Sequence, residues 1–252
     1  MWYIIRMITS KENEKIKNLK QLLKNKQYLF IDNPKVILEA VDGGYALECL
    51  IVNAENSGAD LTKFEKFKEK MIEVNSAVFK LFSTTCNSQG VIGVIKNKER
   101  QLAVPKGNFV VLDALQDPGN VGTILRSALG ADYKDIYLVD CVNALNDKLV
   151  RSSMGAIFKL NIYECTKSEF LDFQKDLRVD LYVGHMQGEN VFEVKAKSPF
   201  GIVVGNEGNG VSKEMFEIAN KKVCVPMKNN LESLNVGVAA SLIMYILNKE
   251  NI

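Results

Sequence analysis

Residues 109–128 read FVVLDALQDPGNVGTILRSA, a short apolar strand that runs into a Pro-Gly turn and then into a helix. The polar residues of this segment therefore follow the carboxyl end of a strand. In open α/β sheets, ligands bind beyond this end of the strands. The segment predicts an α/β fold with a ligand site directly after this strand.

The rest of the second half of the chain repeats this alternation. Further apolar strands are expected at residues 136–139, 181–183, 202–204 and 223–225, with helical patterns between them. Strands that are apolar throughout are buried on both faces, which is typical of a parallel sheet covered by helices. We therefore expect a mostly parallel sheet flanked by helices.

Two more motifs follow strands of this expected sheet. Residues 203–210 read VVGNEGNG, in which three glycines let the backbone approach a ligand, with the spacing of neither a P-loop nor a dinucleotide-binding loop. Residues 223–227 read VCVPM, and residues 232–240 read ESLNVGVAA at the start of an apolar helix. Taken singly, each motif also has a plain structural interpretation: turn chemistry, a helix cap at Asn120 or Asn235, or a surface charge at Arg126.

The first half of the chain has its own α/β pattern. Ser10 followed by Ile16 and Leu19 predicts an N-capped amphipathic helix with a lysine-rich outer face. The first 26 residues carry seven basic and two acidic side chains, a local net charge of +5. This charge fits either phosphate-backbone binding or an ordinary solvated helix face.

Strands at 28–31 and 46–52, and helices at 35–40 and 61–74, complete this half of the chain. The polar stretch at residues 96–101 is the best candidate for a linker. We therefore expect a small N-terminal domain at residues 1–104, with the linker at about 96–104, and a larger domain at residues 105–252.

Composition excludes several classes of protein. Of the 252 residues, 47% are hydrophobic, yet the longest apolar runs are of strand length, so no membrane span is expected. The N-terminus lacks the pattern of a secretory signal, which points to the cytoplasm. The five cysteines are far apart and form no Cys-x-x-Cys pair, which argues against a metal site and a disulfide framework.

The three motifs, in this order and at these spacings, resemble the SpoU/TrmH family of the SPOUT methyltransferases over residues 107–248. Residues 147–156 (DKLVRSSMGA) are similar to the family's helix between the first two motifs. The resemblance implies a deep trefoil knot, a homodimer, and methyl transfer from S-adenosylmethionine to a ribose 2'-hydroxyl of RNA. Residues 7–95 resemble the RNA substrate-binding domain that often precedes it, although Asp32-Asn33 stands where that domain usually has Glu-Gly.

The resemblance also implies roles for individual residues. Arg126 is expected near the target ribose and phosphate, either as a phosphate-oriented base or as a phosphate clamp that polarises the hydroxyl while water or phosphate takes the proton. The residues expected to orient Arg126 and the RNA are Asn120, Glu207, Ser233 and Asn235. The residues expected around S-adenosylmethionine are Gly205, Val225 and Leu234. The single histidine, His185, is interpreted as a polar residue at a strand end.

Three alternatives stay open at this point. The separate N-terminal domain favours ribosomal RNA as substrate, but transfer RNA is the alternative. A SPOUT enzyme that methylates a base nitrogen would lack the Asn-Val-Gly-x-x-x-Arg and Ser-Leu-Asn-Val motifs found here. A non-catalytic RNA-binding or assembly protein on the same fold would have no need of the intact polar set.

Overall fold

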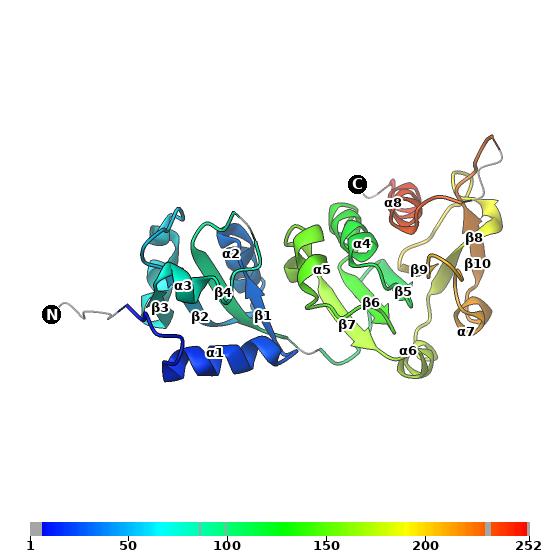
Figure 1. Cartoon of the computed structure of the whole chain (residues 1–252). Helices are drawn as coiled ribbons and strands as arrows, with labels where there is room; N and C mark the ends of the chain where they lie inside the picture. Colours follow the sequence, from blue (N-terminus) through cyan, green and yellow to red (C-terminus); the bar gives the residue numbers. More distant parts are fainter. Residues whose placement is uncertain (1–6, 86, 99, 230–232, 251–252) are drawn as a thin grey trace. The chain divides into compact units, whose positions relative to one another are not determined.

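The computed structural model describes residues 7–85, 87–98, 100–229 and 233–250 and divides the chain into two compact units, Met1–Lys98 and Glu99–Ile252 (Figure 1). The described residues leave out residues 1–6 at the N-terminus, Cys86 of the five cysteines and Glu99 of the expected linker. Each unit is an α/β structure around its own sheet, so the predicted fold class is confirmed. The domain boundary near residue 104 stays a prediction.

The first unit contains a mixed four-stranded sheet in the order β1-β4-β2-β3. Its strands are β1 (Tyr28–Ile31), β2 (Ala46–Asn53), β3 (Met71–Val74) and β4 (Val91–Lys96). Its helices are α1 (Glu14–Lys24), α2 (Pro34–Asp42), the 3-10 helix η1 (Leu61–Lys70) and α3 (Ser76–Phe79). β4 pairs antiparallel with β1 and β2, and β3 pairs parallel with β2.

Helix α1 is amphipathic as predicted, but it begins later than its predicted cap. Ile16 and Leu19 are buried in the core of the first unit, and Lys17 and Lys24 are exposed. The cap is Asn13, whose side chain accepts a hydrogen bond from the backbone N–H of Lys15, whereas Ser10 only closes a turn with Glu12. The prediction of Ser10 as the cap was wrong because both residue types are good caps and the apolar spacing does not choose between them.

The charged helix predicted over residues 61–74 was wrong in its second part. The structure has a 3-10 helix to Lys70 and then β3, whose residues pair with β2. Helical spacing persists in the sequence to Val74, but Val74 is buried as a strand residue against the core of the first unit. Pairing with β2 satisfies the backbone of this segment, which local propensity does not reveal.

The second unit contains a six-stranded sheet in the order β10-β8-β9-β5-β6-β7, with every neighbouring pair parallel. Its strands are β5 (Phe109–Asp113), β6 (Asp135–Val139), β7 (Asn161–Cys165), β8 (Asp180–Asn190), β9 (Phe200–Gly205) and β10 (Lys221–Cys224). Its helices are α4 (Pro118–Gly130), α5 (Asp147–Ser152), the 3-10 helix η2 (Ala156–Lys159), α6 (Lys167–Gln174), α7 (Lys213–Glu217) and α8 (Val236–Leu247).

Helices cover both faces of this sheet. α4, α5 and α8 lie on one face, and α6 and α7 lie on the other (Figure 1). The central strand β5 is buried along its whole length, as is β9 beside it. The loops after β5 and β9, which carry the first two sequence motifs, therefore start side by side at the carboxyl edge of the sheet.

Within the described part of the chain, no helix has the length and apolar character needed to cross a bilayer. The four described cysteines are free. Burial raises the pKa of the Cys49, Cys141 and Cys165 thiols to about 12, so these three side chains stay protonated at neutral pH.

Candidate active site

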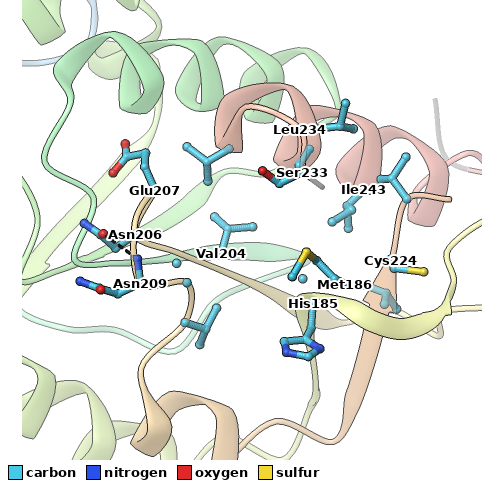
Figure 2. A pocket seen from close by; sticks show the side chains of 18 of the residues that line it. His185, Met186, Val204, Asn206, Glu207, Asn209, Cys224, Ser233, Leu234 and Ile243 are labelled. Atoms are coloured by element: carbon cyan, nitrogen blue, oxygen red, sulfur yellow. Dashed lines mark hydrogen bonds between the residues drawn. The ribbon is translucent and has the colours of Figure 1, made fainter. Parts of the chain in front are cut away.

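A cavity of about 890 Å³ lies at the carboxyl edge of the second unit's sheet (Figure 2). Its walls come from four places: the middle of β8, the end of β9 with its loop and the adjoining α7, the end of β10, and the start of α8. The predicted site residues that line it are Gly205, Glu207, Val225, Ser233, Leu234 and Asn235. Asn120 and Arg126 lie on α4, outside the cavity wall.

Asn120 joins the cavity through hydrogen bonds. Its Nδ2 donates to Oε1 of Glu207 over 2.9 Å, and its Oδ1 accepts from Nδ2 of Asn235 over 2.9 Å. A carboxylate only accepts hydrogen bonds, so Glu207 fixes the orientation of the Asn120 amide, which donates to Glu207 and accepts from Asn235. One polar side chain from each of the three sequence motifs is thus held in a single network.

The helix-cap interpretation holds for Asn235 and is wrong for Asn120. The Oδ1 of Asn235 accepts from the backbone N–H groups of Gly237 and Val238 at the start of α8. The cap of α4 is Asp117, which accepts from the N–H groups of Gly119 and Asn120. Asn120 therefore lies inside the first turn of α4, where its side chain is free to reach Glu207.

Asp117 is itself fixed by a charge from another element. The Nζ of Lys148 on α5 lies 3.1 Å from Oδ1 of Asp117. The hydrogen bond from Lys148, followed by that from the backbone of Gly119, holds the pKa of Asp117 below its ordinary value. The cap of α4 therefore stays ionised and in place at neutral pH.

Arg126 is exposed on α4, less than two turns beyond Asn120. The neighbouring faces of α4 are occupied: Gly122 lies against Ser152 of α5, and the hydroxyls of Ser127 and Ser241 of α8 are 2.6 Å apart. Arg126 makes no hydrogen bond or ion pair with any residue that the structure describes. Its guanidinium is therefore available to an external anion such as a phosphate.

The loop after β9 is held by the end of β5. Asn206 donates to the carbonyl of Ala114 over 3.0 Å, and the backbone N–H of Ser212 donates to Oδ2 of buried Asp113 over 2.6 Å. A Cβ on Gly205 would lie 2.2 Å from the backbone nitrogen of Val211. The glycine is therefore required for the closure of its own loop, whereas the sequence alone had suggested an approach to the ligand.

An interruption of the β8–β10 pairing adds residues that the motifs do not contain. Lys222 pairs with Val183, but the next residue, Val223, pairs with Glu189, so residues 184–188 form a bulge in β8. His185 and Met186 lie in this bulge and line the cavity (Figure 2). The signal in the sequence was the pair of glycines at 184 and 188, because glycine within a strand often marks a bulge.

The cavity suits S-adenosylmethionine in size and lining. Its volume falls within the usual range for small-molecule sites, which is about 300–1,000 Å³. Val204, Leu234 and Ile243 offer an apolar wall, and the carboxylate of Glu207 offers a counter-charge for a cation. Among the residues that the structure describes, no cluster of three metal-ligating side chains occurs.

Comparisons with known proteins agree with this architecture. Residues 107–245 match the model of the SpoU rRNA Methylase family, and residues 13–93 match that of the MRM3-like substrate binding domain. The 23S rRNA (guanosine(2553)-2'-O)-methyltransferase RlmP of Bacillus subtilis is 29% identical over 96% of this chain and 99% of its own. An AdoMet-bound rRNA methyltransferase from Sinorhizobium meliloti superposes with a TM-score of 0.86 at 23% identity, covering 98% of both chains. The crystal structure of an RNA 2'-O ribose methyltransferase superposes with a TM-score of 0.78 at 28% identity, covering 97% of this chain and 99% of the other.

Proposed function

This chain belongs to the SpoU rRNA Methylase family, and from this premise we propose which RNA it modifies and how its residues act. It is an S-adenosylmethionine-dependent RNA 2'-O-ribose methyltransferase that acts on ribosomal RNA. We propose that its target lies in the large-subunit RNA. The relative from Bacillus subtilis, which matches nearly the whole chain, is named for a guanosine of 23S rRNA.

The observation that carries the mechanism is the Asn235–Asn120–Glu207 network at the rim of the cavity. We propose that Gly205, Val225 and Leu234 hold the cofactor, which supplies an electrophilic methyl group when bound. The network then fixes the position of the ribose hydroxyl that accepts the methyl group, because it joins the cavity wall to the helix that carries Arg126. Positioning of this kind is worth about 7–11 kcal/mol, more than general-base assistance supplies.

Arg126 acts as a phosphate clamp in this proposal. A guanidinium stays charged in proteins, so it serves poorly as a proton acceptor but binds a phosphate with two parallel hydrogen bonds. Its exposed position allows it to hold the phosphate beside the target ribose and to polarise the 2'-hydroxyl. Water or the phosphate takes the proton, and Ser233 at the rim orients the RNA backbone.

The direct test is methylation of separated RNA pools. Purified protein is incubated with tritiated S-adenosylmethionine and with 23S, 16S or transfer RNA from cells that lack it, and the labelled nucleoside is identified after nuclease digestion. Label in a 2'-O-methylnucleoside of 23S RNA supports the proposal. Label in transfer RNA alone contradicts the proposed substrate, and cofactor binding without label in any pool favours the non-catalytic alternative.

We also propose that the enzyme is a homodimer that works in the cytoplasm. Val238, Leu242 and Tyr245 form an apolar stripe on α8 at helical spacing, and each is between 38% and 47% exposed. Such a stripe on a single helix is typical of a face that packs against another chain. Fractionation of cells followed by immunoblotting tests the compartment.

Sedimentation velocity tests the dimer. The wild-type protein is expected to sediment as a dimer, and Leu242→Glu is expected to give a folded monomer because it buries a charge in the interface. Lys197→Glu, a charge change at another exposed position, is the matched control and leaves the dimer intact. A wild-type monomer at micromolar concentration contradicts the proposal.

A further inference from the structure

The bulge in β8 brings the only histidine of the chain into the cofactor cavity. Gly188, at the end of the bulge, approaches the backbone of Val223 so closely that a Cβ there would lie 2.5 Å from its carbonyl carbon. Cys224 donates a hydrogen bond from its Sγ to the carbonyl of Gly188 over 3.1 Å. The bulge is thus tied to β10 at one end, and His185 is held at a defined place in the wall.

The imidazole of His185 is oriented on two sides. Its Nδ1 accepts a hydrogen bond from the backbone N–H of Gln187 over 3.2 Å, and its ring packs edge-to-face on Phe216 of α7 with centroids 5.1 Å apart. Because Nδ1 is an acceptor, the neutral ring carries its proton on Nε2. Nε2 makes no hydrogen bond with the described residues, so the ring offers one unused donor at the cavity.

The two sides of the cavity differ in the cofactor groups that they suit. Glu207 and Asn235 join the network that leads to α4, so the reacting methyl group belongs on their side. His185 and Phe216 form an aromatic surface on the strand β8 and the helix α7. An aromatic surface with one N–H donor suits a purine nucleoside, which has a flat apolar base and several hydrogen-bond acceptors.

We propose that His185 is a cofactor-binding residue whose Nε2–H recognises the adenosine half of S-adenosylmethionine. This inference rests on the proposed cofactor cavity. Loss of the Nε2 donor therefore weakens binding of the adenosine half.

The experiment is calorimetric titration of the full-length protein with S-adenosylhomocysteine, and with adenosine, at pH 7.5. His185→Asn keeps an oxygen that can accept from the N–H of residue 187, as asparagine does in Asx turns, but it loses the Nε2 donor. It is expected to bind both ligands about tenfold more weakly than the wild type.

Two further variants separate the possible outcomes. His185→Gln restores an amide donor near the Nε2 position and is expected to recover binding. If His185→Asn binds like the wild type, the residue only supports the bulge, and the inference is wrong. If it weakens S-adenosylhomocysteine but not adenosine, the assignment to the adenosine half is wrong. Leu234→Arg should block the cavity; unchanged binding in this variant overturns the proposed cofactor site and the inference with it.

Discussion

At the scale of single residues, Asn120 shows why an amide is needed between two other polar side chains. It donates to Glu207 and accepts from Asn235 at the same time, which neither an aspartate nor a leucine could do. An amide also adds no charge beside a carboxylate. The network therefore holds the carboxylate of Glu207 in place at the rim of the cavity.

Asn120→Asp is predicted to make the reaction dependent on pH. The new carboxylate would take the place of a donor that lies 2.9 Å from Oε1 of Glu207, and two ionised carboxylates so close repel each other. We expect kcat to fall by about a hundredfold at pH 8 and to recover partly near pH 6, where the pair shares a proton. A pH–rate profile beside that of the wild type tests this, and parallel profiles would contradict it.

Arg126→Lys is predicted to lower kcat without affecting the fold. The side chain is exposed and has no partner among the described residues, so the melting temperature should stay within about one degree of the wild type. A lysine keeps the charge but cannot form the bidentate contact with the phosphate, and we expect kcat to fall by about a hundredfold or more. Single-turnover kinetics with saturating RNA measure the change. An unchanged rate would rule out the clamp.

Residue types and their order pointed to most of the candidate site. Asp-Pro-Gly-Asn, Asn-Glu-Gly-Asn and Ser-Leu-Asn-Val each follow a strand, and the structure joins one side chain from each in a hydrogen-bond network at the rim of the cavity. His185 was not predicted as a lining residue because its place depends on a bulge in the pairing of two distant strands. Periodicity within one segment carries no information about such a register shift.

At the scale of elements, the loop after β9 depends on the absence of a side chain at Gly205. Gly205→Ala would place its Cβ 2.2 Å from the nitrogen of Val211 and force the loop to open. We expect S-adenosylhomocysteine to bind more than about tenfold more weakly, as measured by calorimetry. Gly208→Ala is the control, because the nearest atom to its Cβ lies 3.6 Å away, and its affinity should match the wild type. Equal losses in both variants would contradict this explanation.

The strands in the middle of the second sheet and the edge strands β1 and β10 were predicted, whereas the edge strands β3 and β7 were not. The apolar runs of β5, β6 and β9 stand out because a central parallel strand has no solvent-facing side. β7 was missed because it is the edge strand, and its sequence NIYEC includes an exposed glutamate. β3 was read as helix because its pairing with β2, not its own composition, makes it a strand.

At the scale of the whole molecule, each unit has a hydrophobic core of its own. One core includes Ile16, Phe30 and Phe82, and another includes Val111, Tyr137 and Val203. The two cores share no residue, so each unit has the main requirement for folding alone. The trefoil knot of the second unit stays a prediction. Residue patterns predict which elements are neighbours, but they do not show whether the chain passes through a loop.

Residues 99–252 expressed alone are predicted to fold and to bind S-adenosylhomocysteine within about threefold of the full-length affinity, because every cavity residue belongs to this unit. Their kcat/KM for ribosomal RNA should fall by about a hundredfold, since the unit that matches a substrate binding domain is lost. Circular dichroism, calorimetry and methyl-transfer assays measure the three properties. Full activity of the fragment would assign the first unit an architectural role only.

The wall of the cavity is drawn entirely from residues between Gly184 and Ile243. The ribosome synthesises a chain from its N-terminus, and domains generally fold in that order. The nascent chain therefore completes its first unit and the strands β5 to β7 before any methyl-donor site exists. A premature stop codon before residue 184 would therefore leave a protein with an intact first unit and no means of catalysis. Such a truncated translation product would keep the part of the chain that matches a substrate binding domain but would have no methyl-donor site.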